Sequence, residues 1–221
     1  MLLGPTAPSE ARLRTIRHWT PGYVLHRSRE WAYRHSHPGT PWLTPRATEL
    51  LDQMLLPTDR GLEFGSGWST RWFAQRIHHL VSVEHDQTWH HAVSRQLKDD
   101  AVDNVDHLFV PRDVPETRGG DSEYVGTAAR FADQSLHFVL VDGIYRDHCA
   151  RQALPKIATG GMLVIDNVNW YLPSDSRSPH SRSPADGAAS DVWQEVAETV
   201  AGWRTIWTSC GVTDTAIFVR P

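Results

Sequence analysis

The chain has 221 residues, enough for one domain with a full hydrophobic core. Its 22 Lys and Arg are outnumbered by 26 Asp and Glu, and this net charge of −4 argues against nucleic acid or an anionic membrane as the main partner. The chain has only two cysteines, no apolar N-terminal segment of the signal-peptide type and no run of about 20 apolar residues, so we expect a cytoplasmic protein without a disulfide framework.

Residues 1–55 are expected to form an N-terminal helical lead-in. Residues 1–40 are rich in Arg, His and Trp and are interrupted by two Pro-Gly pairs, a pattern that predicts short helices beside a core. Residues 44–55 place apolar side chains at helical intervals, and Thr44 precedes a proline as the predicted N-cap of a helix.

Strand-like and helix-like segments then alternate over residues 56–221, which we predict to be one domain. The predicted strands are 61–64, 80–85, 105–110, 136–142 and 162–167, and the predicted helices are 69–77, 88–97, 147–157 and 189–203. This alternation indicates a doubly wound α/β fold, with a mostly parallel sheet and helices on both faces. Two further strands predicted within 205–220 would close the sheet as an antiparallel hairpin.

Residues 171–190 differ from the rest of this domain because they are rich in Ser, Pro, Asp and Arg. Such a segment buries little apolar surface. It follows a predicted central strand, and ligands of open α/β sheets bind beyond the carboxyl ends of the strands. We therefore predict a mobile substrate lid there, in preference to a plain surface loop.

A turn with almost no side-chain bulk, Gly65-Ser66-Gly67, joins the first predicted strand of this domain to a helix. Such a turn brings backbone amides and a helix N-terminus close to a ligand. Thr70 stands where a dinucleotide-binding motif has its third glycine, which disfavours a dinucleotide-dependent oxidoreductase. Glu63, just before the turn, suits a positively charged ligand such as an amino-acid ammonium beside a sulfonium.

A second acid, Glu84, ends the next predicted strand. A carboxylate about 20 residues after the glycine turn can accept both hydroxyls of a ribose. The structural alternative is that Glu63 and Glu84 are solvated carboxylates at strand ends.

With these residues in place, the sequence resembles the class I S-adenosylmethionine-dependent methyltransferases. The resemblance rests on LEFGSGWST, VSVEHD, FVLVDGIYR and GGMLVIDN in that order, and it covers about residues 60–220. It implies a Rossmann-like sheet of seven strands in the order 3-2-1-4-5-7-6 with one antiparallel strand, and S-adenosylmethionine as cofactor.

The resemblance also implies which residues contact this cofactor. The glycine turn and the start of the following helix would bend around its methionine part, Glu63 would meet the ammonium, Glu84 would hold the ribose and His85 would flank the adenine. The implied cofactor-binding residues are Glu63, Gly65, Ser66, Gly67, Ser69, Glu84, His85 and Asp142.

Polar side chains end two neighbouring predicted strands. Asp142 closes the first, and Asp166 and Asn167 close the second. Adjacent parallel strands lie about 5 Å apart, so these side chains can converge. Two carboxylates and an amide oxygen suit Mg²⁺. The alternative is that Asp142 caps a helix and that Asp166 and Asn167 begin a turn.

The metal-dependent O-methyltransferases of the catechol and macrocin types hold magnesium at positions that match these three, so the resemblance implies Mg²⁺-assisted methylation of a hydroxyl. The catechol-type lysine, the presumed base, has no counterpart here, because the corresponding stretch is Gly143–Arg146. Asp142 is therefore our first candidate proton acceptor and His148 the second, and Arg146 would hold a substrate oxygen or pair with an acid.

The expected acceptor is a hydroxyl of a sugar or oligosaccharide. Trp42, Trp170 and Tyr171 are expected near the substrate mouth, and aromatic faces beside acids and arginine suit carbohydrates. Low lysine usage is typical of GC-rich bacteria, and the chain resembles small actinobacterial sugar O-methyltransferases of the methylmannose polysaccharide type.

Other acceptors remain open at this point. A natural product or a catechol-like small molecule is the alternative. A nucleic-acid substrate is disfavoured because residues 142–148, DGIYRDH, lack the Pro-Pro pair that methyltransferases acting on amino groups of DNA carry after the corresponding strand. No membrane partner is expected, and the sequence allows a homodimer.

Overall fold

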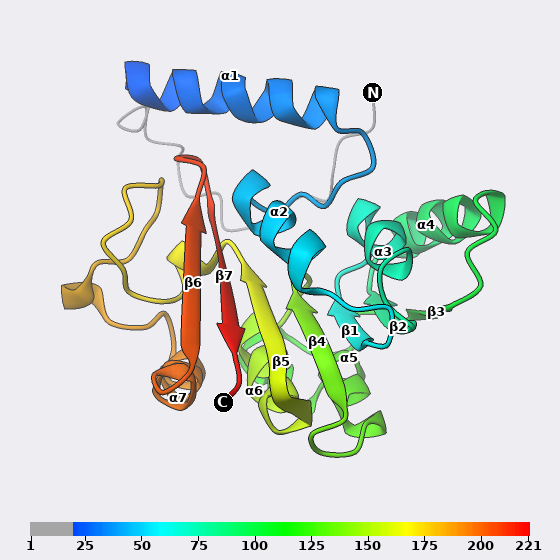
Figure 1. The fold of residues 1–221 in the computed structure, drawn as a ribbon. Coiled ribbons are helices and arrows are strands. Elements are labelled where there is room, and N and C mark those ends of the chain that lie inside the picture. Colours follow the sequence, from blue (N-terminus) through cyan, green and yellow to red (C-terminus); the bar gives the residue numbers. More distant parts are fainter. Residues whose placement is uncertain (1–19) are drawn as a thin grey trace.

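Seven strands form one mixed sheet at the centre of the structure, a computed structural model that describes residues 20–221 (Figure 1). The strands are β1 (Arg60–Phe64), β2 (His79–Glu84), β3 (Val105–Phe109), β4 (Leu136–Val141), β5 (Ile157–Asp166), β6 (Arg204–Ser209) and β7 (Asp214–Val219). They lie in the order β3-β2-β1-β4-β5-β7-β6, which confirms the expected sheet.

Strand direction in the sheet also follows the prediction. Strands β1 to β5 are parallel to their neighbours, and β7 runs antiparallel to both β5 and β6. The carboxyl ends of β1 to β5 therefore meet at one edge of the sheet, where ligands of open α/β sheets bind.

Helices cover both faces of this sheet. They are α1 (Pro21–Ser36), α2 (Pro45–Met54), α3 (Trp68–Ala74), α4 (Gln87–Asp99), α5 (Glu123–Gly126), α6 (Arg146–Ala153) and α7 (Asp191–Val200). Side chains of α5, α6 and α7 join the core on one face, and those of α2 and α3 join the core on the other. This is the doubly wound arrangement expected from the alternation.

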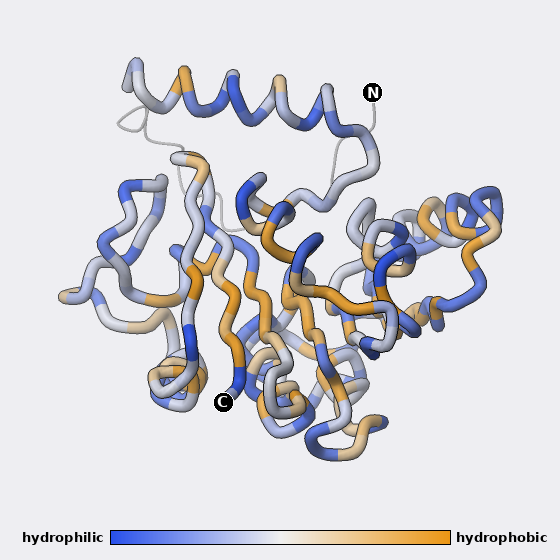
Figure 2. The backbone as a smooth tube through the Cα atoms, in the orientation of Figure 1, coloured by the Kyte–Doolittle hydropathy of each residue, from blue (hydrophilic) through white to orange (hydrophobic). Residues whose placement is uncertain are grey.

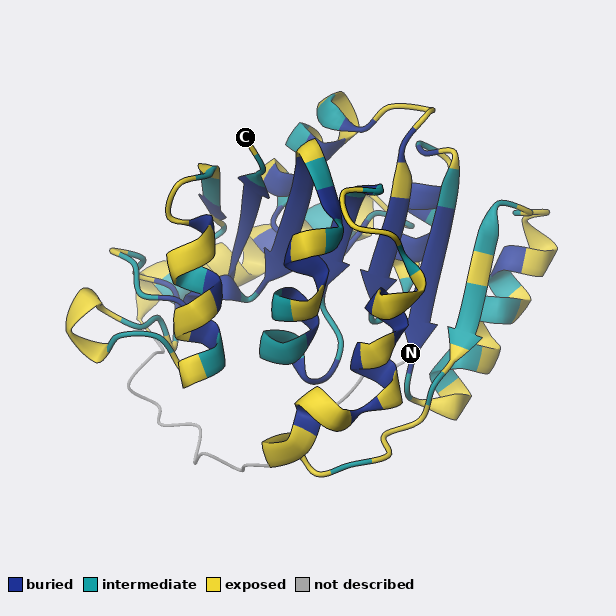
Figure 3. Ribbon diagram, turned by 90° about the horizontal axis from the view of Figure 1, so that it is seen from below, coloured by how far each residue is buried: buried dark blue, intermediate teal, exposed yellow. Residues whose placement is uncertain are grey.

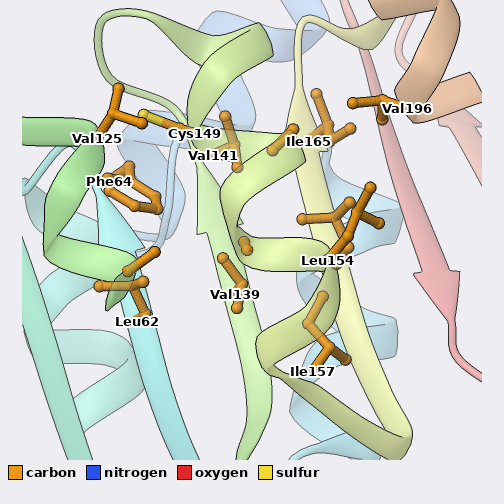
Figure 4. Close-up of a cluster of buried hydrophobic side chains, with 14 of the residues drawn as sticks. Leu62, Phe64, Val125, Val139, Val141, Cys149, Leu154, Ile157, Ile165 and Val196 are labelled. Carbon is orange, nitrogen blue, oxygen red and sulfur yellow. The ribbon is translucent and has the colours of Figure 1, made fainter. Parts of the chain in front are cut away.

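The two cores follow from the period-two alternation of the strands. Val139 and Val141 of β4 point to the face of α6, whereas Phe138 and Leu140 point to the face of α2 and α3. Figure 4 shows Val139 and Val141 within the first core, and Figure 2 shows the apolar strands at the centre of the molecule. The central strands are buried on both faces, and β3 at the edge is only half-buried (Figure 3).

Two elements differ from the prediction. Strand β5 begins at Ile157 rather than at residue 162, because a register shift against β4 accommodates Gly160-Gly161 inside the strand. Helix α6 correspondingly ends at Ala153, and the segment with Pro155 forms a 3₁₀ turn, since proline cannot donate the helical hydrogen bond. Residues 116–130 form short helical turns that no sequence periodicity indicated.

Within residues 20–40, the described part of the segment expected to form short helices, the structure has one long helix. Helix α1 has Pro21 in its first turn and Thr20 as N-cap, so the first Pro-Gly pair begins a helix instead of breaking one. In Figure 1 it runs across the edge of the sheet toward which β4 and β5 point. Residues 1–19, for which short helices are also expected, lie outside the described residues. No helix of residues 20–221 is long and apolar enough to span a membrane.

Candidate functional site

A cavity of about 180 Å³ opens at the carboxyl ends of β1, β2 and β4. It is lined by Trp42, Gly65, Ser66, Gly67, Trp68, Ser69, Glu84, His85, Trp89, Arg112, Asp142, Gly143, Ile144 and Arg146. Every predicted cofactor-binding residue except Glu63 is among them. A wider hollow of about 410 Å³, which includes Arg151 and Glu195, contains none of the predicted site residues and lies apart from this chemistry.

The glycine turn is shaped first by a neighbouring turn of the protein. Gly65 has φ +99°, and a Cβ there would lie 2.7 Å from the backbone nitrogen of Gly143, the residue after Asp142. The turns that follow β1 and β4 are therefore in backbone-to-backbone contact. Gly67 is more open, since a Cβ there would meet nothing closer than Ser69 Oγ at 3.8 Å. Only the second glycine leaves space on the cavity side.

Glu63 lies beneath the turn, not in the cavity. Its side chain is fully buried, and its carboxylate accepts hydrogen bonds from Ser69 Oγ at 2.5 Å, Thr70 Oγ1 at 2.6 Å and Ser82 Oγ at 2.5 Å. Burial raises the pKa of Glu63 to about 7, although the three hydroxyls oppose the rise. The group ties β1, β2 and α3 together, and its expected contact with an ammonium stays a prediction.

Glu84 presents its carboxylate at the cavity wall. Its Oε2 accepts from the Ser66 amide at 3.1 Å, and its Oε1 accepts from the amides of His85 and Asp86, both at 2.8 Å. His85 Nδ1 lies 2.9 Å from Oε1. Because backbone amides fix the carboxylate at the end of β2, it faces the cavity in one defined orientation.

His107 supports the same turn from behind. Its Nε2 lies 3.0 Å from Ser66 Oγ, and its Nδ1 lies 2.9 Å from Ser94 Oγ. The ring stacks on His90 with centroids 4.2 Å apart. Burial, and then the neighbouring His90, lower the pKa of His107 to about 4, so the ring is neutral near pH 7.

The predicted metal ligands converge. The register pairs Val141 of β4 with Ile165 of β5, so the next residues, Asp142 and Asp166, are neighbours across the sheet. Burial raises the pKa of Asp166 to about 7, and the charge of Asp142 adds to that rise. Asn167 follows in the left-handed region at φ +53°, a conformation that asparagine tolerates better than most residues.

Arg146 lies between the side chains of Asp142 and Asn167 and contacts the backbone of Asp166, whose carboxylate accepts from Thr215 Oγ1 at 2.8 Å instead. Its Nη2 donates to Asp142 Oδ1 at 2.7 Å, and its Nη1 donates to Asn167 Oδ1 at 3.1 Å and to the Asp166 carbonyl at 2.7 Å. Burial raises the pKa of Asp142, and the Arg146 charge opposes that rise. Among the described residues, no group of three or more His, Cys, Asp or Glu side chains is arranged to hold a metal ion.

Other predicted residues are separated from the cavity. His148 packs against Gly120, where a Cβ would lie 3.0 Å from its Nδ1, and its Nδ1 lies 3.2 Å from Arg151 Nη2. The structure therefore does not bring this candidate base to the cavity. Of the three aromatic residues expected at the substrate mouth, Trp42 lines the cavity, whereas Trp170 and Tyr171 do not.

Five lining residues were missed by the sequence reasoning: Trp68, Trp89, Arg112, Gly143 and Ile144. Trp68 follows the glycine turn directly, and Trp89 lies in the first turn of α4, where its Nε1 donates to the Ser66 carbonyl at 2.6 Å. Their places next to two motif segments could have indicated them. Arg112 lies in the loop after β3, and no sequence signal marks it.

Residues 171–190 are held by hydrogen bonds within the segment and to the sheet. The Ser174 amide donates to the Arg182 carbonyl at 2.9 Å, and Ser178 Oγ donates to Asp214 Oδ1 at 2.6 Å at the start of β7. No residue of the segment lines the cavity described above. Its movement as a lid stays a prediction.

The site lies within a region that matches a known family model. Residues 62–168, a little under half of the chain, match the model described as a methyltransferase domain. This region begins in β1, ends just after Asn167 and includes the glycine turn, Glu84 and Asp142. Residues 62–168 are therefore similar to a methyltransferase domain. No curated protein matches the chain.

Solved structures resemble the whole fold. A methyltransferase-like protein from Silicibacter pomeroyi is 21% identical, with 81% of this chain and 87% of that one covered at a TM-score of 0.55. A Staphylococcus aureus protein provisionally assigned as a caffeoyl-CoA O-methyltransferase is 13% identical, with 93% and 95% covered at a TM-score of 0.54. A Streptococcus mutans protein provisionally assigned as a methyltransferase, in complex with SAH (S-adenosylhomocysteine), is 8% identical, with 78% and 94% covered at a TM-score of 0.52. At these identities the likeness concerns the fold alone.

Proposed function

We propose that the protein is an S-adenosylmethionine-dependent O-methyltransferase. The observation that carries this proposal is the single cavity that gathers the glycine turn, Glu84 and Asp142 inside the methyltransferase-domain match. The likeness to the S. mutans protein in complex with SAH and to the provisionally assigned O-methyltransferase supports the same reaction class.

The residues present fit the cofactor. The Glu84 carboxylate stands at the cavity wall, so it suits the ribose hydroxyls, and His85 adjoins it for the adenine. Ser66, Gly67 and the start of α3 suit the methionine part. S-adenosylmethionine supplies an electrophilic methyl group when it is bound.

The chain itself orients the acceptor and receives its proton. Asp142 lines the cavity, and its Oδ1 is fixed by Arg146. A carboxylate at this place can accept the proton of an acceptor hydroxyl as the hydroxyl oxygen attacks, and a fixed position makes that transfer efficient. All N–H donors of the Arg146 guanidinium are bonded within the protein, so of its two expected roles we propose pairing with an acid, Asp142, and not holding a substrate oxygen.

Magnesium does not enter this proposal. Two of its three expected ligands, Asp142 and Asn167, already accept hydrogen bonds from a guanidinium that lies between them. As arranged, these oxygens are not free to complete an octahedron around Mg²⁺.

A sugar or oligosaccharide hydroxyl remains the proposed acceptor. Trp42 and Trp68 line the cavity and are 41% and 37% exposed, and Arg112 lines the same cavity. The Arg34 guanidinium covers one face of the Trp42 ring, 4.7 Å from its centroid. Exposed aromatic faces with polar neighbours suit a carbohydrate. A phenolic or natural-product hydroxyl is the second candidate, which the provisionally assigned S. aureus protein favours.

A dinucleotide-dependent oxidoreductase is less well supported. Thr70 replaces the third glycine, and its hydroxyl already accepts from the Gly67 amide at 2.9 Å and donates to Glu63. We also keep the proposals of a cytoplasmic protein and of a small acceptor in place of nucleic acid or membrane, with a homodimer allowed.

The test uses the full chain, methyl-labelled S-adenosylmethionine and matched panels of oligosaccharide and phenolic acceptors. We expect the label in an oligosaccharide, with a mass gain of one methyl group, and SAH as the second product. Asp142→Asn should lose about 10²- to 10⁴-fold in turnover and still bind SAH. Turnover that is unchanged in Asp142→Asn would contradict its role, and label found only in phenols would replace the sugar by the second candidate.

A further inference from the structure

Arg146 is placed by the fold at the point where the ends of β4 and β5 meet. It begins α6 directly after Tyr145, which has φ +48° and ψ +40°. A bulky side chain in the left-handed region is strained and persists only where its surroundings hold it. Asn167, on the other side of the guanidinium, is also left-handed. The two strand-end turns are thus both bent around Arg146.

All five N–H donors of this guanidinium are used within the protein. The Nε donates to the Gly143 carbonyl at 3.0 Å, Nη1 donates to the Asp166 carbonyl and Asn167 Oδ1, and Nη2 donates to the Asp142 carbonyl at 2.9 Å and to Asp142 Oδ1. An arginine has five such donors and cannot accept. Five oxygens thus surround one cation.

The position is also electrostatically complete. The Arg146 side chain is only 16% exposed, and its guanidinium stays charged in the protein. Burial lowers its pKa, but Tyr171, Asp142 and Asp166 outweigh burial and raise it. It lies between Asp142 and Asp166, whose charges repel each other. A divalent ion at the same oxygens would face this positive charge at short range in a poorly solvated site, so its binding there is disfavoured.

We propose that Arg146 is a built-in substitute for the divalent cation, and that methyl transfer in this protein needs no metal. The claim about methyl transfer rests on the proposed function, whereas the claim about Arg146 concerns the site alone. The guanidinium holds the Asp142 carboxylate against the ends of β4 and β5 with its Oδ1 engaged. Within residues 20–221, no hydrogen bond reaches Asp142 Oδ2, so this oxygen is left for the acceptor proton. Arg146 acts through Asp142 and is therefore a positioning residue.

The test measures binding of Mn²⁺, which shares the oxygen ligands of Mg²⁺ and is followed by its electron paramagnetic resonance signal. In the wild-type protein we expect only the signal of the free ion up to millimolar concentration, and no loss of turnover after treatment with EDTA. One bound Mn²⁺ per chain that disappears in Asp142→Asn would overturn the proposal.

Variants of Arg146 separate this role from a merely structural one. Arg146→Ala frees these five oxygens and should acquire Mn²⁺ binding, which loss of packing alone would not create. Arg146→Lys keeps the charge and should bind none. A folded Arg146→Ala that binds no Mn²⁺ would contradict the placement of the cation. If this variant does not fold, the wild-type titration decides.

The same samples distinguish this inference from the proposed function. SAH binding, measured by calorimetry on the wild-type protein, does not depend on Arg146 as a cation substitute. Absence of both Mn²⁺ and SAH binding would remove the proposed function and leave the cation assignment intact. Binding of SAH together with Mn²⁺ at Asp142 would overturn the cation assignment and leave the proposed function intact.

Discussion

At the scale of single residues, the site depends on where backbone can approach backbone. Gly65 and Gly143 allow the turns after β1 and β4 to touch, and this contact places the glycine turn and Asp142 on one cavity. Only a residue without Cβ fits at Gly65, for reasons of both space and positive φ.

Gly65→Ala should therefore destabilise the protein by about 3 kcal/mol or more, because its Cβ would collide with the Gly143 backbone and its φ would be strained. Urea unfolding measures the change. Gly126→Ala is the matched control: this exposed glycine has φ −58° and open space around it, so alanine should be neutral or stabilising by up to about 1 kcal/mol. Equal effects of the two substitutions would contradict the explanation.

The buried Glu63 predicts a specific dependence of stability on pH. Its pKa is raised from 4.5 to about 7 in the folded protein, so the native state binds the proton more tightly than the unfolded state does. Its contribution is fully present below pH 4.5 and is lost as pH rises to 7, by roughly 3 kcal/mol.

Glu63→Gln should remove this dependence, because glutamine resembles the protonated acid. The free energy of unfolding of the wild type relative to Glu63→Gln should fall between pH 4.5 and pH 7. A difference that stays constant over this range, or that grows with pH, would show that Glu63 is ionised at its buried position.

At the scale of elements, the sequence predicted most strands because apolar runs and turns bound them clearly. It missed the turns of 116–130, which make contacts distant in sequence: the Tyr124 hydroxyl, for example, donates to the Val83 carbonyl at 3.3 Å. The predicted helix 147–157 also extends too far, into the start of β5. Gly160-Gly161 is typical of a turn, and the strand accommodates this pair only through the register shift against β4.

Thr44 illustrates a correctly predicted cap. Its Oγ1 accepts from the Ala47 amide at 3.4 Å and lies 2.5 Å from Thr208 Oγ1, and α2 contributes Ala47 and Leu51 to the core. Thr44→Ala should lower the free energy of unfolding by about 1–2 kcal/mol.

Thr20→Ala is the matched cap control. Thr20 caps α1, whose side chains are mostly exposed, so global unfolding should not change when the cap is lost. Thermal and urea unfolding of the two variants test this contrast. A larger loss in Thr20→Ala would mean that α1 is part of the cooperative core.

At the scale of the whole molecule, strand order and the location of the cavity could be predicted because parallel strands bring their carboxyl ends to one edge. The predicted metal centre illustrates what sequence could not give. Asp142, Asp166 and Asn167 do converge, but the spacing of Arg146 in the chain does not reveal that its guanidinium fills the space between them. Likewise, the sequence indicates Glu63 as a cofactor-binding residue, but it does not reveal that the Glu63 carboxylate accepts hydrogen bonds from hydroxyls of α3 and β2.

The central claim is that the cavity at the carboxyl ends of β1, β2 and β4 binds S-adenosylmethionine through Glu84. The most direct measurement is calorimetric titration of SAH into the wild-type protein, Glu84→Gln and the exposed control Glu198→Gln. We predict one SAH per chain, affinity about 10-fold or more weaker in Glu84→Gln because a charged hydrogen-bond acceptor is lost, and no change in Glu198→Gln. Absence of binding to the folded wild-type protein, or equal affinity in all three, would contradict the account.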